Sequence, residues 1–171
     1  MARTQRPPKK KHVNRPRPSA VVPLTAGERG VKAQEEFEKA VTHLIEAERM
    51  AEWARAPNAC VHSAYYAMHH STCAALLASG GVGKYLDVPK SHEHVIQHYG
   101  NLVSNEAEPL KSTGLELSRA RTDRMVADYD LVRGANNADA KITVRSARAM
   151  VDAIMARWGF YDNVTQELDE D

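Results

Sequence analysis

The sequence predicts an all-α protein, a bundle of about five helices between two charged tails. Three observations support this fold class. Apolar residues recur at the i, i+3, i+4, i+7 spacing of amphipathic helices, short turns join the segments with this spacing, and strand-like alternation is absent. With 171 residues, 43% of them hydrophobic, the chain is long enough for one domain with a sizeable core. Residues 25–160 are therefore predicted to form one helical domain.

The two ends of the chain differ in composition from this central part. Residues 1–24 form a basic, Pro-rich tail whose first 23 residues hold seven Lys or Arg, five Pro and no acid. This composition favours disorder, and the tail either adds nonspecific affinity for nucleic acid or serves only as a solubilising extension. The rest of the chain has 16 basic and 22 acidic residues, five of the acidic ones within the last ten. The body is thus not a basic nucleic-acid clamp, and residues 161–171 form an acidic tail.

Hydropathy and cysteine usage indicate the compartment. No apolar run approaches the roughly 20 residues of a membrane-spanning helix, and the N-terminus lacks the apolar stretch of a secretion signal. We expect a cytoplasmic protein with no membrane partner. Cys60 and Cys73 are predicted to lie on one helix, about 20 Å apart, which is too far for a disulfide. Both are expected to be reduced thiols.

The first two helices are predicted from residue 26 to about 55 and from 58 to about 79. The apolar positions of the first are Ala33, Phe37, Ala40, Val41, Leu44, Ile45 and Ala51. Pro57 and Asn58 end this helix and start the second. The second ends at the glycine-containing loop SGGVGKYLDVPK.

Three further helices follow this loop. Ser91 is expected to cap a short helix that runs to about residue 103. The next helix spans about 110–133, and a GANN turn separates it from the last, about 139–158. The apolar contacts of the last helix are expected from Ile142, Ala149, Val151, Ile154 and Trp158.

The second helix contains the unusual stretch SAYYAMHHSTCAALL, residues 63–77. On a helix its side chains form two neighbouring stripes. The first stripe is Tyr65, His69, Thr72 and Leu76, and the second is Tyr66, His70, Cys73 and Leu77. Most of these positions are expected to face other helices.

Histidine is concentrated in the same region, since six of the eight histidines fall between His62 and His98. His94 and His98 have the i, i+4 spacing that can hold one metal from a helix face, but two ligands are not a site. The segment HEHVIQH is not the metalloprotease H-E-x-x-H, because Ile96 stands at the second His position. We therefore expect ordinary core and surface histidines and no metal.

A second motif, RTDRMVADYD, occupies residues 121–130 of the fourth predicted helix. Arg121, Arg124 and Asp128 lie on one side of it, and Arg124 and Asp128 have the spacing of an ion pair. One interpretation is a solvated salt bridge, which spacing alone favours. The other is a cation held over a cleft by a carboxylate, in position to bind a phosphate.

Four blocks of the sequence carry a resemblance to a known family. They are SAYYAMHHSTCAALLASGG, SHEHVIQHYG, RARTDRMVADYD and SARAMVDAIMARW. In this order they resemble the HEPN domain family, in the branch with a Y-Y-A-M second helix and an R-x-x-A-D-Y fourth helix, over about residues 25–160. The resemblance implies a bundle of four or five helices and a homodimer with the fourth-helix motif at its cleft. It also implies prokaryotic systems in which such a protein accompanies a nucleotidyltransferase, as toxin and antitoxin, or assists RNA processing.

The chain departs from the catalytic members of that family. The resemblance implies metal-independent ribonucleases with an R-x4-6-H motif on the fourth helix, where Arg binds the phosphate and His transfers a proton during attack by the RNA 2′-hydroxyl. Here Tyr129 stands five residues after Arg124, and the last histidine of the chain is His98. A tyrosine with a pKa near 10 is almost entirely neutral at pH 7 and is a poor base. Arg55 and His62 also fit R-x6-H, but they span the turn between the first two helices, and we interpret this as a chance match.

Two functions remain open. The first, which we favour, is a non-catalytic or weakly catalytic homodimer that binds RNA, a nucleotide or a protein partner through a cleft. Its residues are Arg121, Arg124, Asp128 and Tyr129, with Tyr65, Tyr66, His69 and His70 as supporting residues. The second is a metal-independent toxin endoribonuclease in which His69 or His70 replaces the missing histidine. No cofactor is expected in either case.

Overall fold

The computed structural model describes residues 22–130 and 133–165, and within them it confirms the all-α prediction. The helices are α1 (Ala26–Trp53), α2 (Pro57–Ala78), α3 (His92–Val103), α4 (Leu110–Tyr129) and α5 (Asn137–Trp158), with a short 3-10 turn, η1 (Gly83–Tyr85). Among the described residues, the β interactions amount to one isolated bridge between Val82 and Asp87. Within these residues, no helix is both long and apolar enough to cross a membrane.

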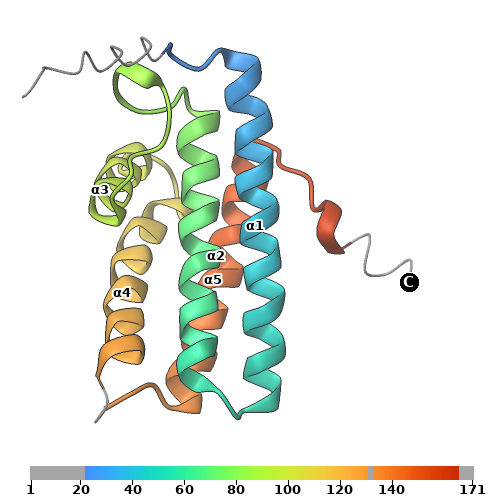
Figure 1. The fold of residues 1–171 in the computed structure, drawn as a ribbon, viewed down its shortest axis with the longest axis vertical. Helices are drawn as coiled ribbons and strands as arrows, with labels where there is room; N and C mark the ends of the chain where they lie inside the picture. Colours follow the sequence, from blue (N-terminus) through green and yellow to red (C-terminus); the bar gives the residue numbers. More distant parts are fainter. Residues whose placement is uncertain (1–21, 131–132, 166–171) are drawn as a thin grey trace, which may run out of the picture.

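Four helices run along the long axis of the molecule, and α3 lies to one side, against α2 and α4 (Figure 1). Along the chain α1, α2, α4 and α5 alternate in direction (Figure 1). The helix α2 contacts every other helix, whereas α1 and α4 flank it without contacting each other. One strip of α2 between α1 and α4 is therefore covered only in part, by α3.

The core forms around α2, because 14 of the 22 residues of this helix are buried. Phe37 and Leu44 of α1, Met150 and Ile154 of α5 and Leu117 of α4 are fully buried against it. The apolar positions predicted for α1 are buried from Ala33 to Leu44, as their spacing required. Cys60 and Cys73 are buried, unpaired thiols, as predicted.

Local signals placed several helix ends correctly. Pro57 is the first residue of α2, where its missing N–H costs nothing. The Ser91 hydroxyl caps α3 by accepting a hydrogen bond from the backbone N–H of His94 at 3.2 Å.

Other expectations at the helix ends were wrong. The fourth helix ends at Tyr129 rather than near residue 133, because Asp130 is extended and its carboxylate accepts a hydrogen bond from the Arg133 backbone N–H. The fifth begins two residues early, at Asn137, because the Asn136 side chain caps it. Ile142, expected in the core, is exposed.

The two predicted tails fall largely outside the described residues, which begin at 22 and end at 165. The segment after α5 lies along α1. The ring of Phe160 stacks on Phe37 with centroids 4.8 Å apart, and the Gln34 amide donates a hydrogen bond to the Tyr161 carbonyl. The packed part of the chain thus continues a few residues beyond 160.

Candidate functional site

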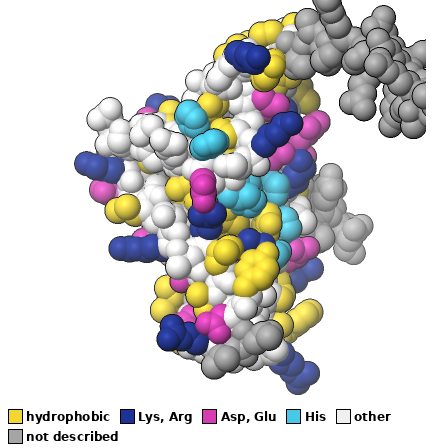
Figure 2. All heavy atoms as spheres, turned by 60° about the vertical axis from the view of Figure 1, so that its left-hand side comes forward, with side chains coloured by type: hydrophobic (Ala, Val, Ile, Leu, Met, Phe, Trp, Pro, Cys, Tyr) yellow, Lys and Arg dark blue, Asp and Glu magenta, His cyan; other side chains and the backbone are white. Residues whose placement is uncertain are grey.

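The partly covered strip of α2 carries a group of closely packed rings, which we call the ring cluster. Its members are His43 of α1, His62, Tyr65, Tyr66, His69 and His70 of α2, and His92 of α3. Histidine side chains gather in the middle of one face of the molecule, beside hydrophobic and basic side chains (Figure 2). Five of the eight residues in the two predicted stripes are buried, as expected for most of them, whereas Tyr66, His69 and His70 are only half-buried.

Arg124 of α4 lies at the edge of the ring cluster. Its Cζ atom is 5.7 Å from the ring centroids of both Tyr66 and Tyr129, a distance suited to cation–π contact. Its Nε atom lies 2.6 Å from Asp128 Oδ2, and the Arg124 side chain is only 17% exposed. Nε is buried without an aligned hydrogen bond in spite of this short distance. The guanidinium is thus held in place by charge and by two rings.

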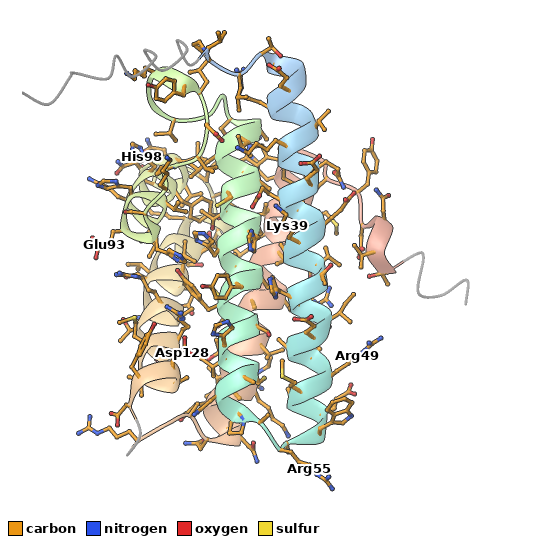
Figure 3. The ribbon with its side chains drawn as sticks, in the orientation of Figure 1. Lys39, Arg49, Arg55, Glu93, His98 and Asp128 are labelled. Atoms are coloured by element: carbon orange, nitrogen blue, oxygen red, sulfur yellow. The ribbon has the colours of Figure 1, made fainter. Side chains whose placement is uncertain are left out.

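Asp128 joins Arg124 to the central helix. Figure 3 shows Asp128 on the side of α4 that faces α2. Its two carboxylate oxygens lie 3.1 and 3.2 Å from Nδ1 of His62, in addition to the contact with Arg124. The His62 side chain is 42% exposed. A carboxylate bound to Nδ1 fixes the orientation of the imidazole and leaves Nε2 free to exchange a proton.

His62 is the site residue that sequence reasoning missed. The Arg55–His62 pair was interpreted as a chance match, and no role was expected for His62. A signal was present, since His62 lies one helical turn before Tyr66 and two before His70. Contact with Asp128, 66 residues away, follows from the packing of α2 on α4 and could not be read from local spacing.

The structure brings three of the four predicted cleft residues together and places the fourth, Arg121, apart from them. Arg124, Asp128 and Tyr129 lie together, and Tyr129 is 68% exposed. Arg121 lies one turn earlier on α4 and binds Glu93 of α3 through Nη2 at 3.1 Å. Arg121 is therefore at the α3 end of the site rather than beside Asp128.

Tyr65 and His69 serve mainly to attach α3 to α2. Tyr65 is fully buried, and a hydrogen bond joins its hydroxyl to Nδ1 of His92. The His69 ring stacks on that of His92, with centroids 4.2 Å apart. Burial, reinforced by neighbouring histidines, lowers the pKa of His69 to about 3, and burial raises the pKa of Tyr65 to about 12. Both side chains are neutral at pH 7 and unsuited to proton transfer.

His70 points toward α1. Its Nδ1 lies 2.7 Å from Glu36 Oε2, and its ring stacks on that of His43 at 5.5 Å and 8°. Burial raises the pKa of Glu36, but hydrogen bonds from His70 and Lys39 outweigh this and hold it at about 2. The ring cluster thus has one end at Arg124 and another at Glu36, with Tyr66 between them.

The Glu36 contact gives a test of stability. Glu36→Gln should lower the free energy of unfolding at pH 7 by about 1 to 3 kcal/mol, because charge-assisted hydrogen bonds are lost. The folded-state pKa lies below the unfolded value, so this stabilisation is present above about pH 4.5 and is lost as the pH falls toward 2. Urea unfolding should therefore show that the free energy of unfolding drops less between pH 7 and pH 3 in the variant than in the wild type. Glu35→Gln, an exposed neighbour, is the control, and equal losses in Glu36→Gln and wild type would contradict the assignment.

The site has no arrangement typical of a metal centre. In the described part of the chain, no group of three or more His, Cys, Asp or Glu side chains is placed to hold a metal ion. His94 and His98 are exposed on α3.

The fold and the site together define an all-α protein with a strip of rings that ends at an arginine. The chain matches no protein-family model and no curated protein.

Proposed function

We propose that the protein is a homodimer of the HEPN type that binds RNA or a nucleotide in the cytoplasm through a phosphate at Arg124. The resemblance further suggests a nucleotidyltransferase as a partner in a toxin–antitoxin pair. The observation that supports phosphate binding is the state of Arg124. Its guanidinium is held at the edge of the ring cluster by Asp128 and two tyrosine rings, and 17% of the Arg124 side chain remains exposed.

The chemistry of this group suits a phosphate. A guanidinium presents planar N–H donors in the fork that matches two phosphate oxygens. Asp128 shares its single negative charge between Arg124 and His62. Fluorescence anisotropy titrations with a labelled RNA and a labelled nucleoside monophosphate test the proposal, and loss of binding in Arg124→Ala is the expected result.

The homodimer is supported by an uncovered stripe on α4. Its members are Leu115, Ser118, Thr122, Met125 and Tyr129, which are all exposed and follow one another at three- or four-residue spacing. Thr122, Met125 and Tyr129 line a shallow hollow in the surface. A second copy packed on this stripe would lie next to Arg124 and form a cleft there.

Dimerisation can be tested by a charge in the middle of this stripe. Met125→Glu should convert the dimer to a monomer at micromolar concentration, because the carboxylate would be desolvated in the interface. Light scattering measures the mass directly. Val31→Glu, a matched change at an exposed position of α1, should leave the dimer intact. A wild-type chain that is monomeric would contradict the dimer, and so would a Met125→Glu variant that remains dimeric.

A second function is favoured by one specific observation, the His62–Asp128 pair beside Arg124. His62, oriented through Nδ1, can accept the proton of a ribose 2′-hydroxyl at Nε2 while Arg124 binds the phosphate. The 2′-oxygen then attacks the phosphorus, and the bond to the 5′-oxygen of the next nucleotide breaks. The 5′-oxygen takes a proton from water as it leaves, which gives a 2′,3′-cyclic phosphate and a 5′-hydroxyl, and His62 then releases its proton to solvent. In this metal-independent endoribonuclease, His62 takes the role that was expected of His69 or His70.

A further inference from the structure

We propose that the ring cluster is a stacking platform for the bases of a single-stranded oligonucleotide, which runs from Arg124 across α2 to His43. This inference rests on the proposed phosphate site and names its ligand as an oligonucleotide of several residues rather than a mononucleotide. A mononucleotide needs one ring and one phosphate group. The ring cluster contains more rings than a mononucleotide would contact.

The rings and Arg124 form an unbroken series across three helices. Tyr129 and Tyr66 each lie 5.7 Å from the Arg124 guanidinium, on α4 and α2 respectively. The Tyr66 ring is 5.7 Å from that of His43 on α1. His70 continues the series at 5.5 Å from His43. These side chains come from segments far apart in the sequence and meet on one face.

Partial exposure distinguishes these rings from core residues. The His43 side chain is 31% exposed, and Tyr66 and His70 are half-buried, whereas Tyr65 beneath them is fully buried. Burial lowers the pKa of His43 from its ordinary value, so this ring is neutral at pH 7. Its contact with a ligand is therefore stacking rather than ionic.

Stacking suits nucleic acid because every base has a flat π-face, and platforms of this kind bind single strands with little sequence preference. The charged groups along the strip are paired. Arg124 pairs with Asp128 at one end, and Lys39 pairs with Glu36 near the other. Glu46 lies beside the His43 ring. The strip therefore offers more ring surface than phosphate contacts, which is the composition expected where bases supply much of the affinity.

The test uses the full chain and three labelled probes of equal length, about ten nucleotides, within the range that such platforms occupy. The probes are a single-stranded RNA, an abasic ribose-phosphate oligomer and a duplex RNA. The wild type should bind the single strand at least about fivefold more tightly than either of the others. Equal affinity for the abasic oligomer or for the duplex would overturn the proposal.

Two variants of one residue separate stacking from other effects. His43→Ala should weaken binding of the single strand about fivefold or more, leave the abasic oligomer unchanged and show the same effect at low and high salt. His43→Phe should restore binding, since it retains a flat ring without the imidazole nitrogens. Unchanged binding in His43→Ala, or no recovery in His43→Phe, would overturn the proposal.

Arg124→Ala makes the two proposals distinguishable. If this variant binds all three probes as the wild type does, the phosphate site itself fails. If it weakens all three while His43→Ala weakens none, the phosphate site stands and only the stacking platform fails. Both variants keep residues 1–21, so any contribution of the basic tail cancels in the comparison.

Discussion

Arg124→Ala should weaken binding of RNA or a nucleotide by about 10- to 100-fold. The change removes the charge-assisted contact with the phosphate, worth about 1.5 to 3 kcal/mol. The free energy of unfolding should fall by about 1 to 3 kcal/mol, because a largely buried ion pair and two ring contacts are lost while Asp128 keeps His62 as a partner. Anisotropy titrations and thermal melts of the same preparations measure the two effects.

Two further variants make this result specific to the site. Arg124→Lys should rescue binding poorly, since a point charge does not reproduce the planar, two-pronged contact. Arg148→Ala is the matched control, because Arg148 of α5 pairs with Glu48 of α1, away from the ring cluster. If Arg124→Ala binds as tightly as Arg148→Ala, the ion pair with Asp128 is only structural.

His62→Ala should reduce RNA cleavage by about 100- to 10,000-fold, the usual contribution of a general base, while binding changes little. Asp128→Asn should reduce cleavage as well, because the amide no longer holds the imidazole in the required tautomer. Cleavage is measured on metal-free protein in the presence of a chelator, and the 2′,3′-cyclic phosphate end is identified by mass spectrometry.

The control for this change is His94→Ala, an exposed histidine of α3 outside the ring cluster. It should cleave RNA as the wild type does. Cleavage that survives in His62→Ala at the wild-type rate would exclude His62 as the base. A wild-type chain that binds RNA without cutting it would exclude the ribonuclease and leave the binding function in place.

Sequence alone was sufficient for most of the fold, because the signals that determine helices are local. The spacing of Ala33, Phe37 and Leu44 predicted the buried side of α1, and Pro57 and Ser91 marked helix starts. The errors arose where a side chain outside the periodic pattern decided the outcome. Asn136 capped α5 two residues early, and Asp130 ended α4 before the apolar pattern did.

The candidate site was predictable only in part. Arg124 and Asp128 lie on one helix at i, i+4, so their pairing could be read from spacing. His62 could not be assigned in this way, because it meets Asp128 through the packing of two helices. The separate roles of His69 and His70 could not be predicted either. These two residues are neighbours in the sequence, but His69 packs against α3 and His70 against α1.

The measurement that tests phosphate binding at Arg124 most directly is an NMR titration of the full chain with single-stranded RNA, following arginine Nε–Hε, histidine ring and tyrosine ring resonances. We predict that the largest shifts occur at Arg124, His62 and Tyr66, with smaller ones at His43. Resonances of Arg148 and Arg157, on the other side of the bundle, should stay in place. Shifts confined to residues outside the ring cluster, with Arg124 unmoved at saturating RNA, would contradict the proposed site.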